Sequence, residues 1–238
     1  MRHMPSVRAA VVVTSDKCYE NQDWERGYVE TDPFGGHDPY SGSKGAAEIA
    51  AASMRRSFFS APSAAAVATA RAGNVIGAGD WSAHRIVPDC IRALRAGEPV
   101  VLRNPSAVRP WQHVLDALHG YLVLGGKLLT DGHRYTGGWN FGPTPRGLVP
   151  VRDLVDTVIK AWGEGRYEIE ASGAARPAEA RFLHLDSTKA QTELGWAPRL
   201  ELRDAVKMTV DGYRAESSAA PALYAHRVEQ IRTFRGLS

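Results

Sequence analysis

Three adjacent polar residues, Ser15-Asp16-Lys17, follow an apolar run and place a hydroxyl, a carboxylate and an amine side by side. The run before them, residues 9–14, is rich in β-branched side chains and apolar on both faces, which is typical of a strand buried in a parallel sheet. Ligands of parallel sheets bind beyond the carboxyl ends of the strands. The triplet is therefore expected at a functional edge, where its side chains could exchange protons with a ligand.

Tyr40 and Lys44 in the stretch YSGSK form a second candidate pair. They follow Asp38-Pro39, which indicates a helix N-cap and a proline in the first turn. A spacing of four places both side chains on one helix face, where the ammonium and the helix N-terminus favour a phenolate. Such a tyrosine could take a proton from a hydroxyl while hydride leaves the same carbon. The spacing alone is common, and a surface tyrosine and lysine is the alternative.

The bulk composition excludes several classes of protein. The chain has 238 residues, a hydrophobic content of 44%, a charged content of 23% and a net charge of +3, which suits one large or two modest globular domains. Its scattered basic residues predict neither nucleic-acid nor membrane binding, and no apolar run is long enough to span a bilayer. The two cysteines form no disulfide framework or zinc spacing and favour a cytoplasmic setting.

Strand and helix patterns alternate along the chain, which favours an α/β fold with a parallel sheet. A glycine-punctuated loop is expected at 73–81, and Ala47 to Phe58 present one apolar helix face. Strands are expected at 9–14, 65–71, 100–103 and 139–141, and further helices at 86–96, 114–129, 151–162, 187–194, 202–213 and 224–234.

Six stretches together resemble the extended short-chain dehydrogenase/reductase family, also described as NAD-dependent epimerases and dehydratases. They are VTSDKCYEN, GGHDPYSGSKGAAE, RAGNVIGAGDW, RNPSAVRPWQHVLD, GWNFGP and LGWAPR. Related sugar-nucleotide dehydratases usually have a glutamate where this chain has Lys17, so the resemblance is greatest to the CDP-glucose 4,6-dehydratase branch. It implies a partial Rossmann-like sheet with a smaller C-terminal α/β substrate domain, NAD as cofactor and CDP-glucose as substrate.

The resemblance also implies catalytic roles. Tyr40 is the base that helps oxidise C4 of the glucose, and Lys44 assists it and holds the nicotinamide ribose. Ser15 hydrogen-bonds the C4 oxygen, Asp16 protonates the departing C6 hydroxyl, and Lys17 replaces the carboxylate that removes the C5 proton. Hydride then returns to C6, which gives a 4-keto-6-deoxy sugar nucleotide and restores NAD.

The role of Lys17 has alternatives. A protonated lysine is no base, so Lys17 must be neutral when it acts, stabilise the enolate at C4–C5 electrostatically, or simply pair with Asp16.

Further positions are binding candidates. Thr14, Arg71 and Gly73 are expected to contact the cofactor together with Tyr40 and Lys44. The substrate-binding candidates are Asn74, Arg103, Arg109 and His113. Arg109 suits a diphosphate clamp because arginine binds phosphate bidentately, with an ion pair to Asp116 as the alternative, and His113 is equally a packed structural residue. Cys18 has no evident histidine partner and is interpreted as a bystander, while Trp81, Trp111 and Trp139 are expected in the core. No metal site is expected.

The glycine-rich G-x-G-x-x-G loop that cradles the NAD pyrophosphate is absent from the sequence. We therefore expect a chain that lacks the N-terminal third of a dehydratase and binds NAD weakly or not at all by itself. The expected domains are the remainder of a dinucleotide-binding domain (1–75, with 107–135) and a substrate domain (76–106 and 136–238). A homodimer, or pairing with a chain that supplies the missing part, is expected; the alternatives are another sugar-nucleotide epimerase or dehydratase, or a non-catalytic remnant.

Overall fold

The computed structural model describes residues 3–4, 6–170 and 182–237, and these residues form two compact units. Of the described residues, those within 1–73, 116–142 and 183–197 form the first unit, and those within 74–115, 143–182 and 198–238 form the second. The chain passes between the two units five times, so each unit is assembled from three segments that are distant in sequence.

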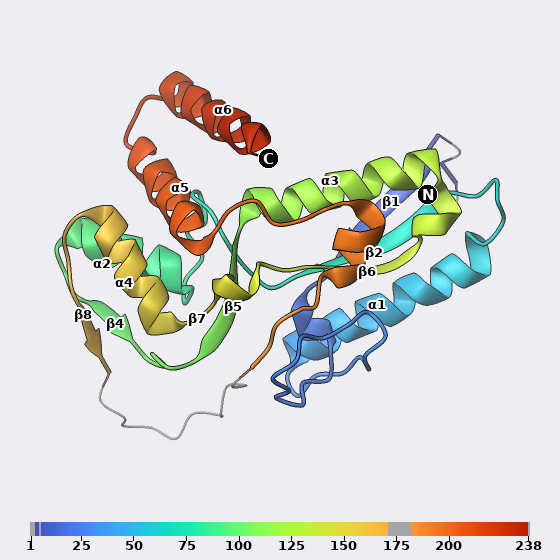
Figure 1. The fold of residues 1–238 in the computed structure, drawn as a ribbon, viewed down its shortest axis with the longest axis horizontal. Coiled ribbons are helices and arrows are strands. Elements are labelled where there is room, and N and C mark those ends of the chain that lie inside the picture. Colours follow the sequence, from blue (N-terminus) through green and yellow to red (C-terminus); the bar gives the residue numbers. More distant parts are fainter. Residues whose placement is uncertain (1–2, 5, 171–181, 238) are drawn as a thin grey trace. The chain divides into compact units, whose positions relative to one another are not determined.

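The first unit is built on a parallel three-stranded sheet in the order β1-β2-β6. The strands are β1 (Ala9–Val13), β2 (Ala66–Ala72) and β6 (Gly137–Phe141), and every described residue of β2 is buried. Helix α1 (Pro39–Phe58) lies on one side of this sheet and α3 (Val114–Thr130) on the other (Figure 1). The three-layer arrangement and the parallel register confirm the predicted α/β fold class.

The core of the first unit lies between α3 and the sheet. Small alanines on β2 leave room for Leu124, Leu128, Trp139 and Phe141, which are all almost fully buried. A short π-helix, Ala190–Leu194, and the buried Trp196 close this core. The indole nitrogen of Trp196 donates to the carbonyl of Asp116 at 3.2 Å.

Helix α1 begins as the sequence predicts, but it buries a different face. Asp38 is its N-cap and Pro39 its first residue. The buried residues, however, are Ser41, Gly45 and Glu48, while Met54 and Phe58 of the predicted apolar face are 45% and 42% exposed. The helix is therefore held to the sheet by polar contacts and close backbone approach rather than by its large apolar side chains.

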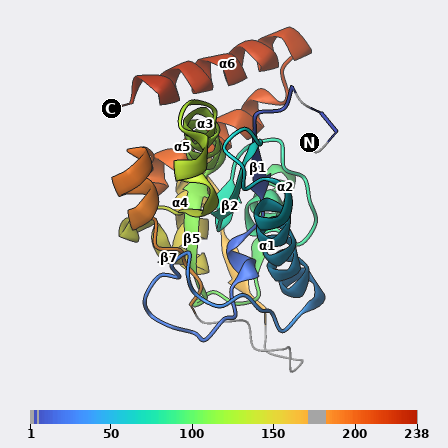
Figure 2. The same cartoon turned by 90° about the vertical axis from the view of Figure 1, so that its right-hand side faces the viewer.

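The second unit has two small sheets beside a group of helices (Figures 1 and 2). One sheet has the order β3-β5-β7, and the other pairs β4 with β8. Aliphatic side chains of α2, α4 and α5 share one core with Trp111, and α6 packs on α5. The bounds are β3 (Asn74–Ile76), β4 (Val100–Leu102), β5 (Val108–His113), β7 (Leu148–Pro150), β8 (Tyr167–Ile169), α2 (Ile86–Ala96), α4 (Val151–Trp162), α5 (Leu202–Ala215) and α6 (Ala220–Gly236).

Several predicted elements differ from the structure. The expected loop at 73–81 contains β3. Strands β7 and β8 were not predicted because each has only three residues, and β5 was not predicted because its sequence, VRPWQH, contains a proline and lacks a clear alternating pattern. Residues 136–142 and 183–197, expected in the second domain, belong to the first unit, and residues 107–115, expected in the first domain, belong to the second unit. Among the described residues, no helix is long and apolar enough to cross a membrane.

Two glycines of α3 provide a matched test of this packing. A Cβ at Gly120 would lie 2.4 Å from the Phe141 ring, whereas a Cβ at Gly126 would meet nothing within 4 Å. We expect Gly120→Ala to lower the free energy of unfolding by about 1–3 kcal/mol through overpacking. Gly126→Ala should raise it by about 0.5–1 kcal/mol through helix propensity. Urea denaturation measures both, and equal effects of the two substitutions would contradict this packing.

Candidate active site

The Ser15-Asp16 pair forms a tight turn directly after β1. The parallel ladder continues one residue past the strand, with the amide of Thr14 bonded to the carbonyl of Ala70 at 2.9 Å. Ser15 then caps a single 3₁₀ turn, Asp16–Cys18. Its Oγ accepts from the amide of Lys17 at 3.2 Å and donates to Asp16 Oδ1 at 2.8 Å. The structure therefore joins two of the three triplet side chains at the predicted strand edge.

Both members of this pair are buried, while Lys17 is exposed. Ser15 is 8% and Asp16 4% accessible. The Asp16 charge also reaches Tyr121 on α3: burial raises the pKa of the Tyr121 hydroxyl to about 12, and the Asp16 carboxylate adds to this shift. The alternative of a Lys17 partner for Asp16 stays open.

The N-terminus of α1 presents Tyr40 and Lys44 together. Asp38 Oδ1 accepts from the amides of Tyr40 and Ser41 at 2.9 and 3.0 Å. The Lys44 Nζ lies 5.5 Å from the centre of the Tyr40 ring, and Tyr40 is 55% exposed. The predicted lysine–tyrosine neighbours are therefore on one open helix face.

Lys17 is electrostatically linked to the start of this helix. Hydrogen bonds from Ser41 are the main cause that lowers the pKa of the Asp38 carboxyl, and the Lys17 charge contributes to the same shift. The turn and the helix also approach closely, since a Cβ at Gly45 would lie 3.3 Å from the carbonyl oxygen of Cys18. The two predicted groups of catalytic residues thus belong to elements that pack against each other.

Behind these groups lies a buried ion pair that sequence reasoning missed. Glu48 of α1 accepts from Arg71 Nε and Nη2 at 2.8 and 2.9 Å, and its Oε1 also accepts from the Thr14 hydroxyl. Arg71 Nη1 donates to the Tyr19 hydroxyl, which in turn donates to Asn140 Oδ1 at 2.8 Å. The sequence signal for Glu48 was its spacing, four residues after Lys44 and eight after Tyr40.

Two of the predicted cofactor contacts, Thr14 and Arg71, belong to this network. The side chains of Thr14 and Arg71 are bonded within the first unit, and Gly73 follows β2 at its carboxyl end. Direct cofactor contacts from these residues stay predictions.

The predicted substrate-binding residues all belong to the second unit. Asn74 is on β3 opposite Trp111 of β5, and Arg103 is exposed after β4. Arg109 is half-buried on β5, and its Nη1 donates to the carbonyl of Val108 at 2.8 Å. Phosphate binding by Arg109 stays a prediction.

His113 is a packed residue. It is 3% exposed, its Nδ1 accepts from the amide of Leu115 at 3.2 Å, and burial lowers its pKa to about 4. Its ring is therefore neutral near pH 7, and the Leu115 contact favours the structural alternative of the sequence analysis; a substrate contact stays a prediction.

Other aromatic and thiol residues are mostly structural. Trp111 and Trp139 are buried as expected, but Trp81 is 40% exposed and bonds Glu216 through its indole nitrogen. Cys18 is fully buried, and burial raises the pKa of its thiol to about 12, which agrees with a bystander role.

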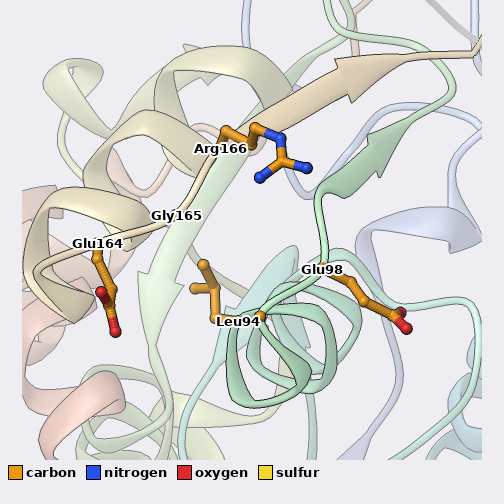
Figure 3. A pocket seen from close by; sticks show the side chains of 6 residues that line it. Leu94, Glu98, Glu164, Gly165 and Arg166 are labelled. Atoms are coloured by element: carbon orange, nitrogen blue, oxygen red, sulfur yellow. The ribbon is translucent and has the colours of Figure 1, made fainter.

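A separate cavity of about 240 Å³ lies in the second unit and contains none of the predicted residues. It is lined by Leu94, Gly97, Glu98, Glu164, Gly165 and Arg166. Figure 3 shows the side chains of Glu98 and Glu164 on opposite sides of Leu94, so the carboxylates do not converge. Among the described residues, no group of three or more metal-ligating side chains occurs either.

The residues present fit one end of a dinucleotide. The Tyr40 hydroxyl and the Lys44 ammonium are suitable donors for a ribose beside a reacting ring. The pyrophosphate end finds no cradle at α1: the Glu20 side chain fills the space beside Gly35, Gly36 donates to Glu20, and Asp38 occupies the first helical amides. Two carboxylates there would repel a phosphate.

Comparison with known proteins identifies the family. The sequence model of a family described as GDP-mannose 4,6 dehydratase matches residues 3–209. The chain belongs to this family. It is 42% identical to the CDP-glucose 4,6-dehydratase of Salmonella typhimurium over 219 residues, which cover 90% of this chain and 61% of that protein. The predicted resemblance to sugar-nucleotide dehydratases is confirmed, and the chain spans under two thirds of the length of this relative.

Other relatives and solved structures agree with the family fold. The dTDP-glucose 4,6-dehydratase of Streptomyces antibioticus is 29% identical over 90% of this chain and 59% of its own length. The crystal structure of dTDP-glucose 4,6-dehydratase from Bacillus anthracis in complex with NAD has a TM-score of 0.72 at 21% identity, over 89% of this chain and 64% of that one. The structure of UDP-glucuronic acid 4-epimerase from Bacillus cereus in complex with UDP-glucuronic acid and NAD has a TM-score of 0.74 at 16% identity, over 90% of this chain and 64% of that one. At these identities the structural likeness establishes the fold.

The burial of His113 predicts a pH dependence of stability. Its folded pKa of about 4 lies below the usual 6.5, so between these values the unfolded chain binds a proton that the folded chain does not. Lowering the pH from 7 to 5 should therefore cost about 2 kcal/mol of unfolding free energy through this group. The side-chain oxygen of His113→Asn can still accept from the amide of Leu115. Over the same change of pH, the unfolding free energy of this variant should fall by about 2 kcal/mol less than that of the parent.

Urea denaturation at both pH values measures this difference, with His133→Asn at an exposed histidine as the control. An equal loss of stability in the parent and in His113→Asn would contradict the neutral, buried histidine.

Proposed function

We propose that this chain carries the catalytic residues of a CDP-glucose 4,6-dehydratase. The supporting observation is the buried, hydrogen-bonded Ser15-Asp16 turn packed against the helix that presents Tyr40 and Lys44. The 42% identity to a CDP-glucose 4,6-dehydratase over 90% of this chain supports the substrate. Epimerases need no acid in this turn, so the placement of Asp16 disfavours them.

Asp16 is the proton donor of the elimination in this proposal. Loss of water from C5 and C6 requires a proton for the departing C6 hydroxyl, and Asp16 supplies it. The Ser15 hydroxyl, which donates to Asp16 Oδ1 in this structure, would rotate to donate to the C4 oxygen of a bound substrate. Burial of both groups excludes water from the proton transfer.

Tyr40 is the base: as a phenolate, favoured by the Lys44 ammonium 5.5 Å from its ring centre, it takes the proton of the C4 hydroxyl and becomes a neutral phenol. NAD, when bound, would supply reversible oxidation at C4, and Tyr40 and Lys44 are the residues that would hold its ribose end. Lys17 acts at the C5 proton, either as a neutral base or by stabilising the enolate, and it lies near the Asp38-capped start of α1.

The second unit is proposed to bind the nucleotide part of the substrate. Arg109 is the proposed diphosphate ligand, with Asn74 and Arg103 as further contacts. We further propose that the outer edge of β1, which carries no strand among the described residues and leaves Val13 52% exposed, pairs with another chain. A chain that supplies a phosphate cradle would strengthen the weak NAD binding expected of this chain.

Turnover tests the catalytic assignment. With CDP-glucose and millimolar NAD, we expect the chain to form a 4-keto sugar. The absorbance of this product in alkali measures the rate. Asp16→Asn and Tyr40→Phe should each lower kcat at least about 100-fold because each removes a proton-transfer group. The matched controls are Asp131→Asn and Tyr224→Phe, which alter an exposed aspartate and an exposed tyrosine. A parent chain without turnover, or either variant near the parental rate, would contradict the assignment.

Cofactor affinity tests the missing cradle. Calorimetric titration of the purified 238-residue chain should give NAD binding no tighter than millimolar. The reason is that Tyr40 and Lys44 suit only the ribose end of the dinucleotide, while carboxylates occupy the start of α1. Micromolar affinity would show that this chain already contains a pyrophosphate site, which would contradict the prediction of weak NAD binding.

A further inference from the structure

Three charged or polar residues of α1 follow one another at intervals of one turn on a single face. Tyr40 is open to solvent, Lys44 is half-buried and Glu48 is 2% exposed. The face therefore runs from the proposed reaction edge into the interior of the first unit. Glu48 lies about 12 Å along the helix from Tyr40, at 1.5 Å per residue. A fixed point at Glu48 constrains where the first turn of a rigid helix can lie.

The partners of Glu48 come from the two strands that end at the same edge. Thr14 directly precedes the Ser15-Asp16 turn, and Arg71 is the penultimate residue of β2. Arg71 binds both carboxylate oxygens with parallel N–H donors, at 2.8 and 2.9 Å. A bidentate pair of this kind fixes direction as well as distance. The helix is thus held in translation and rotation against the strand ends.

The same guanidinium also holds the far side of the acid-bearing turn. Arg71 Nη1 donates to the hydroxyl of Tyr19, the residue that follows the Asp16–Cys18 turn. Tyr19 is 2% exposed and is bonded onward to Asn140 of β6. One side chain therefore joins the helix that carries Tyr40 to the turn that carries Asp16.

We propose that Glu48 is a positioning residue: through Arg71 and Thr14 it fixes α1 so that Tyr40 and Lys44 are held in register with the Ser15-Asp16 turn. Glu48 touches no reacting atom in this role. The catalytic consequence rests on the proposed function, whereas the fixing of the helix does not.

The charge state of the pair suits this role. Burial acts to raise the pKa of the Glu48 carboxyl, but the hydrogen bonds and charge of Arg71 outweigh it, and the net pKa is lowered. Both partners are therefore charged near pH 7. A purely stabilising role for the ion pair is the competing explanation. Apolar side chains of similar volume often replace a buried ion pair without loss of stability. If the pair only stabilised the fold, such a replacement would leave the position of α1 unchanged, whereas a positioning role predicts that α1 shifts.

The test separates position from stability. The variant Glu48→Met with Arg71→Met removes the pair without leaving a lone buried charge, and Glu48→Gln with Arg71→Gln serves as the second variant if the first does not fold. The control, Arg26→Gln, breaks another bidentate arginine–carboxylate contact, to Asp32 in the loop before α1. Thermal unfolding of each variant establishes that it is folded.

The position of α1 is measured by double electron–electron resonance between spin labels attached at Ser43→Cys on α1 and Asp131→Cys after α3. Both native cysteines are buried, so the introduced thiols are the ones labelled. We expect the distance distribution to shift or broaden in the double variants and to stay unchanged in Arg26→Gln. An unchanged distribution in a folded double variant would overturn the proposal, whatever its turnover.

Turnover is the second readout. A folded double variant should lose about 100-fold in kcat, as a displacement near 1 Å does, with KM for CDP-glucose within about twofold of the parent. A kcat within about threefold of the parent would overturn the proposal. A shifted distance distribution with no turnover in the parent would leave Glu48 as the residue that fixes the helix and would reject the dehydratase assignment instead.

Discussion

The arrangement of the first unit depends on one buried guanidinium. Arg71 lies between the helix that carries Tyr40 and the turn that carries Asp16, and its donors are shared between Glu48 and Tyr19. An arginine buried at 2% exposure is tolerated only when its charge is compensated, and loss of one partner of such a pair typically costs about 3–5 kcal/mol. The polar interior behind the reaction edge is therefore a strict constraint on the position of α1.

This constraint explains why α1 departs from an ordinary amphipathic helix. Its buried face carries serine, glycine and glutamate, and its larger apolar side chains are exposed. Gly45 permits close approach to Cys18, and Glu48 supplies the directional contact. A contact between apolar side chains would leave the helix more freedom to slide along the sheet, whereas the bidentate pair specifies one register. The proposed proton-transfer groups at the helix start depend on that register.

The sequence predicted what local patterns determine. The start of α1 at Asp38-Pro39 was predicted from its capping residues and matches the structure, and so do the predicted bounds of α2 and α4. Ser15 and Asp16 were placed at a strand end because a buried β-branched run precedes them. The family resemblance added the catalytic roles, which no local pattern contains.

Long-range contacts were beyond the sequence. Glu48 and Arg71 are 23 residues apart, and nothing near either one indicates that they meet. Strands β3 and β5 form by pairing with each other, which no local pattern indicates. Met54 was wrongly expected on the packed face of α1, because helix periodicity does not show which face a sheet will cover. The exchange of segments between units likewise depends on tertiary packing rather than on composition.

The central claim is that the residues at this edge carry out an internal transfer within one sugar. The most direct measurement uses CDP-glucose labelled with deuterium at C4 and locates the label in the product by NMR and mass spectrometry. The account predicts a 4-keto-6-deoxy product that retains the deuterium, now at C6. Deuterium that remains at C4 of an unchanged or epimerised sugar, or that is lost to solvent, would contradict it.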